Sequence, residues 1–98
     1  MRCLTLGASG TTYTAPADGW VTIVLTFKNT DLSTRYCRLK CTQSLLNTFS
    51  IQNNISNGQV GCYLPVKKGE TYLCIYYVGQ ITAIEFIFTY AVGSEPLA

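Results

Sequence analysis

The side chains best suited to chemistry in this sequence are its cysteines. Cysteine can ligate a metal, form a disulfide or act as a nucleophile, so the spacing of the thiols distinguishes between these uses. Cys37 and Cys41 lie four residues apart in a predicted strand. A rise of about 3.3 Å per residue separates their Cα atoms by roughly 13 Å, which is beyond disulfide reach. This spacing is also not that of a zinc knuckle. The five cysteines are Cys3, Cys37, Cys41, Cys62 and Cys74.

Their redox state and metal binding can be predicted from their number and their neighbours. An odd count argues against a disulfide framework, as does an N-terminus, "MRCLTLGASG", whose apolar part is too short for a signal peptide. The chain contains no histidine to complete a metal site. Cys62 and Cys74 stand among alternating apolar residues. We therefore expect five reduced cysteines, mostly buried as small hydrophobic side chains, and no metal ion.

Acid–base catalysis lacks candidate residues, because histidine is absent and only five carboxylates exist. Asp18 and Glu70 stand beside glycines in predicted turns, and Glu95 precedes Pro96 in the tail, so no acid–base pair is evident. The sequence also has no Gly-rich phosphate loop and no G-x-S-x-G elbow. We expect neither an enzyme nor a bound cofactor. The five carboxylates are Asp18, Asp31, Glu70, Glu85 and Glu95.

The largest group of positive charges is Arg35, Arg38 and Lys40, within one predicted strand. Alternation places Arg38 and Lys40 on the face opposite Leu39 and Cys41, and we interpret the group as a solvated strand face. A nucleic-acid groove would need more cations, interleaved with aromatic side chains. We therefore expect no nucleic-acid partner.

The elements that position these residues are almost all strands. Thr, Val, Ile, Tyr and Phe are frequent, and turn signals such as "PADG", "NNISNG" and "VKKGE" recur at intervals of roughly eight to twelve residues. The pattern predicts an all-β domain over residues 1–98, an antiparallel jelly-roll β-sandwich of seven to eight strands, with residues 91–98 as a C-terminal tail. Strands are expected near 20–28, 35–42, 45–51, 59–66, 71–78 and 83–91, with one or two shorter ones before residue 15.

The composition indicates a subunit of a larger assembly. Charged residues make up 12% of the chain and hydrophobic residues 48%, whereas about 25% charged residues is usual in soluble domains. A chain of this size buries only about 60–65% of its surface by folding. No apolar run reaches the roughly 18–20 residues of a membrane-spanning helix, so we expect no membrane insertion. A partner subunit is the expected cover for the remaining apolar surface.

Segment 20–28 is largely apolar on both faces. Alternate residues from Val21 to Phe27 share one face, and those from Trp20 to Thr26 share the other. In a sandwich one face meets the opposite sheet, so the other is expected to meet a second subunit. Aromatic side chains of the late strands extend the pattern, although they could equally fill a single core. The aromatic residues expected at a subunit interface are Trp20, Tyr72, Tyr76, Phe86, Phe88 and Tyr90.

Three blocks carry a resemblance to a known family: "YTAPADGWVTI" (13–23), "PVKKGETY" (65–72) and "FIFTYAVGSE" (86–95). In order and spacing they resemble the head domains of bacteriophage tail fibres and, more distantly, trimeric jelly rolls of the tumour-necrosis-factor and complement-head type. Gly19 and Gly69 fit this pattern as residues of tight turns. The resemblance implies a tumour-necrosis-factor-like homotrimer at a fibre tip, which binds a bacterial surface glycan or outer-surface protein. It also implies a virion protein that is synthesised in the bacterial cytoplasm.

Two other functions remain open. A structural trimerisation or virion-assembly module would share this fold but would have no affinity for cells. A secreted cytokine-like ligand would need a signal peptide, which we do not recognise in the first ten residues.

Strand direction predicts where a receptor would bind. Consecutive strands of an antiparallel jelly roll run in opposite directions, so successive loops alternate between its two ends. Loops 29–34, 53–58 and 79–82 then share one end, whereas "VKKGE" and the turn 42–44 lie at the other. Polar side chains of the first set suit a sugar or a polar protein epitope, although asparagine also serves turn geometry. The predicted receptor-binding residues are Asn29, Asp31, Asn53, Asn54, Asn57 and Gln80.

Overall fold

The computed structural model describes residues 2–28, 34–43, 47–52, 57–77 and 81–93, in which strands are connected by turns and no helix occurs. Each expected strand from residue 20 onward is present, and its ends differ from the expected ones by at most two residues. The strands are β1 (Arg2–Cys3), β2 (Thr11–Thr14), β3 (Gly19–Lys28), β4 (Arg35–Cys41), β5 (Asn47–Gln52), β6 (Asn57–Val66), β7 (Thr71–Tyr76) and β8 (Ile81–Tyr90).

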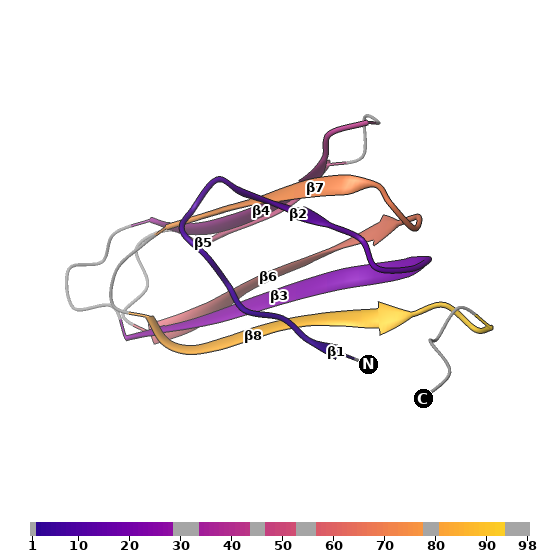
Figure 1. The fold of residues 1–98 in the computed structure, drawn as a ribbon. Coiled ribbons are helices and arrows are strands. Elements are labelled where there is room, and N and C mark those ends of the chain that lie inside the picture. The colour runs from indigo at the N-terminus through magenta and orange to yellow at the C-terminus, as the bar shows by residue number, and fades with distance from the viewer. Residues whose placement is uncertain (1, 29–33, 44–46, 53–56, 78–80, 94–98) are drawn as a thin grey trace.

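These strands form two antiparallel sheets that pack face to face (Figure 1). Sheet A has the order β1-β8-β3-β6, and sheet B has the order β2-β7-β4-β5. Strands that follow one another in the sequence lie in different sheets, except β4 and β5, which both belong to sheet B. The prediction of an all-β, two-layer antiparallel fold is confirmed.

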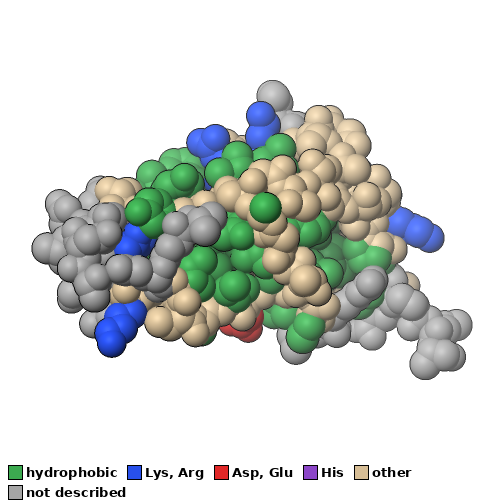
Figure 2. All heavy atoms as spheres, turned by 60° about the vertical axis from the view of Figure 1, so that its left-hand side comes forward, with side chains coloured by type: hydrophobic (Ala, Val, Ile, Leu, Met, Phe, Trp, Pro, Cys, Tyr) green, Lys and Arg blue, Asp and Glu red, His purple; other side chains and the backbone are tan. Residues whose placement is uncertain are grey.

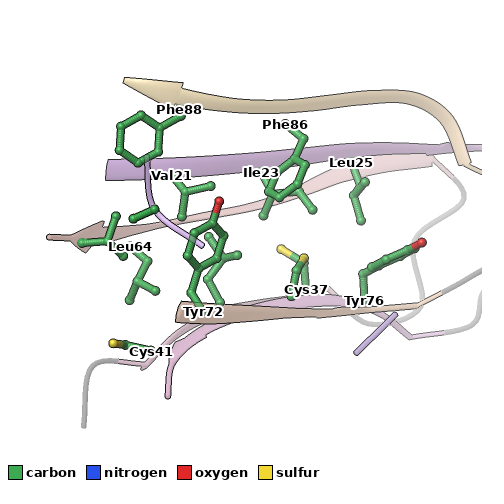
Figure 3. Packing of buried hydrophobic residues seen from close by; sticks show 14 of the residues in the cluster. Val21, Ile23, Leu25, Cys37, Cys41, Leu64, Tyr72, Tyr76, Phe86 and Phe88 are labelled. Carbon is green, nitrogen blue, oxygen red and sulfur yellow. The ribbon is translucent and has the colours of Figure 1, made fainter. Parts of the chain in front are cut away.

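The core lies between the sheets and is built by alternation of buried and outward residues, which is clearest in β3, β4 and β7. In β3 the side chains of Val21, Ile23, Leu25 and Phe27 are buried, whereas the residues between them are exposed or half-buried. Figure 3 shows side chains from both sheets pointing toward one another across this layer. Each fully buried aliphatic side chain contributes roughly 1.5–3 kcal/mol, so the inward face of β3 is a major source of stability.

Four of the aromatic residues expected at a subunit interface belong instead to this core. Tyr72, Phe86 and Phe88 are at most 3% exposed and Tyr76 is 9% exposed, so they are not available to contact a second subunit. In sheet A, Phe88 lies opposite Val21 across the β3–β8 ladder and shares its inward direction. Both faces of β7 and β8 carry apolar residues, which is why alternation alone did not identify the inward face. The expectation was wrong for these four side chains.

The other two residues of that set lie nearer the surface. Trp20 is 40% exposed on the outward face of β3. Tyr90 is half-buried, and its ring packs edge to face on Phe88 with 5.2 Å between ring centroids. Only Trp20 therefore retains the open, outward position that a subunit contact requires.

The two glycines of the resemblance serve different purposes. Gly69 has a φ of 86°, which the turn after β6 requires and which other residues rarely adopt. Gly19 does not have a positive φ. It lies where β3 meets the end of β8, and a Cβ there would collide with the carbonyl of Thr89 and the ring of Phe88. The expectation of a turn role was wrong for Gly19, which is required by close strand packing.

Candidate binding surfaces

Three strands of the sandwich finish, and three begin, at one end, which we call the loop end. The register pairs Lys28 with Asn57 and Phe27 with Ile81 in sheet A, and Arg35 with Gln52 in sheet B. Connections 29–34, 53–56 and 77–80 therefore depart from the same end, at the left of Figure 1, as strand direction predicted. Of the predicted receptor-binding residues, Asn57 begins β6. The others lie outside the described residues: Asn29, Asp31, Asn53, Asn54 and Gln80.

A buried arginine lies directly beneath the loop end. The guanidinium carbon of Arg35 is 4.3 Å from the ring centroid of Tyr77 and 5.4 Å from that of Phe27, so it joins the two sheets through cation–π contacts. Its side chain is only 1% exposed. The interpretation of a solvated face is therefore wrong for Arg35, although it is confirmed for Arg38 and Lys40, which are exposed. Alternation with buried Leu39 could have indicated this position from the sequence.

The outer face of sheet B carries a groove that the sequence did not indicate. It is lined mainly by Tyr36, Arg38, Phe49, Ile51 and Ile75, and its volume is about 240 Å³. Arg38 lies over the ring of Phe49, with 5.9 Å from guanidinium carbon to ring centroid. Exposed aromatic and apolar side chains thus line this groove, and the same face of sheet B also carries positive charge.

Among the described outward side chains, those of sheet A carry no net charge, whereas those of sheet B are positive. The outer face of sheet A presents Trp20 and Tyr63, and Tyr63 is 63% exposed. Val24 on β3 and Ile87 on β8 point the same way and are half-buried. Among the outward side chains described on this sheet, Lys28 and Glu85 alone are charged. Figure 2 views the sandwich from its side, where hydrophobic side chains lie across the middle of the molecule and Lys and Arg lie toward its margin.

The opposite, or turn, end is held by hydrogen bonds to carboxylates. Asp18 Oδ1 accepts from the backbone N–H of Lys68 at 2.9 Å, and Glu70 Oε1 accepts from that of Lys67 at 2.6 Å. The backbone N–H of Gly69 also donates to the carbonyl of Ala15, at 3.0 Å. Asp18 and Glu70 thus stabilise turns, as their sequence positions indicated. Within the described ranges, no three or more Cys, Asp or Glu side chains are grouped to share a metal ion.

All five cysteines are free, in agreement with the sequence. Cys37, Cys41 and Cys74 are buried, Cys62 is half-buried and Cys3 is exposed. The Sγ atoms of Cys37 and Cys62 are 3.6 Å apart across the two sheets. Burial and the nearby charge of Cys62 raise the pKa of Cys74 to about 12. The sequence offered no sign of the Cys37–Cys62 contact, because the two residues lie on different sheets.

Comparison of the chain with protein-family models, curated proteins and solved structures finds no match. Among the described residues, no helix is long and apolar enough to cross a membrane. Function must therefore be argued from the geometry and from the sequence blocks.

Proposed function

We propose that this chain is the receptor-binding tip of a bacteriophage tail fibre, a non-catalytic homotrimeric jelly roll in the virion that attaches to a bacterial surface glycan or outer-surface protein. The observation that carries the proposal is the loop end, where three connections of polar sequence leave a rigid two-sheet scaffold at one place. Binding residues commonly occupy loops that a rigid scaffold positions.

The order of strands supports the jelly-roll part of the proposal. Orders β1-β8-β3-β6 and β2-β7-β4-β5 are those expected when eight antiparallel strands cross repeatedly between two four-stranded sheets. The three blocks that resemble tail-fibre heads fall on β2–β3, β6–β7 and β8. They meet around the turn end, which leaves the loop end to vary with the ligand.

The outer face of sheet A is the surface that we propose for trimer formation. Its described outward charges are one of each sign, Glu85 opposite Val24 and Lys28 at the loop end, so no net charge on this face opposes self-association. Trp20 and Tyr63 would be the main aromatic contacts, because both are outward and well exposed. This surface replaces the buried aromatic residues as the candidate for self-association.

Adsorption to cells tests the receptor-binding part. The purified protein is screened against a panel of bacterial strains, and a strain that binds it is used for variants. Replacing Asn53, Asn54 and Asn57 together with Ala should lower adsorption at least about tenfold, since each lost hydrogen bond to a sugar is worth roughly 0.5–1.5 kcal/mol. Light scattering should find the mass of the assembly unchanged.

The matched control changes the turn end. Replacing Lys67 and Lys68 with Ala alters exposed side chains at the opposite end and should leave adsorption unchanged. Loss of binding in the lysine variant with full binding in the asparagine variant would contradict the proposal. Adsorption to no strain would favour the structural trimerisation module instead.

A further inference from the structure

We propose that Cys37 and Cys62 are a redox-sensitive pair, which closes reversibly into a disulfide between the two sheets when the protein meets a hydroperoxide or a small-molecule disulfide. The inference concerns a modification site in the scaffold and does not depend on receptor binding.

The geometry brings the two thiols close enough to react. Cys37 lies on the inward face of β4 in sheet B, and Cys62 lies on the inward face of β6, the edge strand of sheet A. Their Sγ atoms are 3.6 Å apart. A disulfide bond is about 2.05 Å long, so the sulfur atoms must approach each other by only about 1.5 Å. Strands β4 and β6 already pass close to each other along this side of the sandwich.

The two cysteines differ in a way that assigns a role to each. Cys62 is half-buried at the sheet edge, so a small oxidant can reach it, whereas Cys37 is fully buried. The hydrogen bond between the two thiols lowers the pKa of Cys62, against the effect of desolvation, and a hydrogen bond from the backbone N–H of Leu39 lowers this pKa further. The same hydrogen bond, together with burial, raises the pKa of Cys37. Because an oxidant from solution can reach Cys62 but not Cys37, we assign Cys62 as the thiol that reacts first and Cys37 as the resolving thiol.

The reaction balances with the oxidant supplied from solution. The Cys62 thiolate attacks one oxygen of hydrogen peroxide, the O–O bond breaks, and Cys62 sulfenic acid and hydroxide form. The Cys37 sulfur then attacks the Cys62 sulfur, which breaks the S–O bond. The leaving hydroxide takes up the Cys37 proton as water. With a small-molecule disulfide, two exchange steps give the same product and release two thiols.

The remaining buried cysteines do not share this arrangement. The Cys41 thiol lies 3.7 Å from Glu70 Oε2 and 3.9 Å from Gln43 Oε1, so these hydrogen-bond contacts are to oxygen atoms rather than to a thiol. Cys74 is fully buried, and its raised pKa keeps it protonated. In a reducing cytoplasm the Cys37–Cys62 pair is expected to stay open, and outside the cell it is expected to close.

Oxidation of the folded protein tests the proposal. The Cys3→Ser variant is used as the background, because the exposed Cys3 thiol would otherwise join two molecules. Hydrogen peroxide or oxidised glutathione should lower the number of free thiols from four to two per chain, and dithiothreitol should restore all four. Mass mapping of proteolytic peptides should identify the Cys37–Cys62 link. The Tm should rise by roughly 10 °C on closure.

Three further variants provide controls in the same background. Cys62→Ala should keep all three remaining thiols after oxidation, and Cys37→Ala should lose at most the Cys62 thiol, as a sulfenic acid or a mixed disulfide, without forming an internal link. Cys41→Ala should still lose two. Peptide mapping of the Cys3→Ser protein needs no core variant, so the test holds even if a variant fails to fold. Survival of four thiols under oxidant, or a link between any other two cysteines, would overturn the proposal.

Discussion

At the scale of single residues, several charged and reactive side chains of this protein stabilise the scaffold or lie within it. Arg35 is buried between two rings, Asp18 and Glu70 hold turns, and Cys74 lies in the core with no exposed surface. The Cys74 thiol is a weak acid, and its burial favours the neutral form in the folded protein. Folding therefore becomes less favourable at pH values where the unfolded chain loses that proton.

Cys74 allows a prediction about alkaline stability. Its pKa rises from 9.0 to about 12 in the folded protein, so its contribution to stability is complete below pH 9 and is lost as the pH rises from 9 to 12. One titrating thiol should lower the free energy of unfolding by about 1.4 kcal/mol per pH unit in this window. Desolvation raises the pKa of Tyr76 as well, which acts in the same direction above pH 10.

Urea unfolding at pH 7.5, 9.5 and 10.5 can measure this loss. The Cys74→Ala variant should be less stable at pH 7.5, because it leaves a cavity, but its stability should fall less steeply with pH. By pH 10.5 the wild type should have lost about 2 kcal/mol more than the variant. Parallel curves for the two proteins would show that Cys74 does not titrate as expected.

At the scale of elements, the long β3–β8 ladder organises sheet A. Gly19 pairs with Tyr90 at its end, and the two backbones approach too closely there for a side chain. Because a Cβ at Gly19 would meet backbone atoms of β8, which cannot rotate away, the neighbouring strand would have to shift.

Gly19→Ala should therefore lower the free energy of unfolding by about 2–3 kcal/mol, the usual cost of overpacking. Gly7→Ala is a matched control, since its Cβ would meet only side-chain atoms of Thr11 and Tyr13, at 3.1 to 3.4 Å. Those side chains can adjust, and the change should be below about 1 kcal/mol. Both are measured by urea unfolding at one protein concentration. Equal effects would mean that β8 tolerates a shift at this point.

At the scale of the whole molecule, the two outer faces of the sandwich differ in charge. Sheet B exposes Arg38 and Lys40 on its outer face, whereas the outer face of sheet A carries Trp20, Val24 and Tyr63 with one charge of each sign, Lys28 and Glu85. A chain with 12% charged residues has too few charges to cover both faces. This difference in net charge is the reason for proposing sheet A, rather than sheet B, as the face of the trimer.

This preference can be tested by introducing a charge on each face, at one of two similarly exposed aromatic residues. Tyr63→Arg on sheet A should convert a trimer into a monomer, which light scattering at micromolar concentration would record as a roughly threefold lower mass. Phe49→Arg on sheet B, where the ring is 60% exposed against 63% for Tyr63, should leave the trimer intact. Dissociation by Phe49→Arg alone would assign the interface to sheet B, and a monomeric wild type would exclude self-association through either face.

The positions of the strands, the alternation that places Val21, Ile23, Leu25 and Phe27 on one face and the sharing of one end by three connections could be predicted from the sequence. These features are local or depend on parity, because side chains in a strand alternate and antiparallel strands reverse direction. The same alternation assigned Arg38 and Lys40 to the outer face. It also places Arg35 on the inner face, although a charged residue is not usually expected there.

The inward face of β7 and β8 was decided only by the tertiary structure. Both of their faces are apolar, so Tyr72 and Phe88 could have pointed either way until the second sheet covered one side. The Cys37–Cys62 contact and the groove around Phe49 are likewise products of packing between or across strands. Such contacts join residues distant in the chain, and their distances depend on how one sheet is stacked and rotated against the other, which no local pattern of residues specifies.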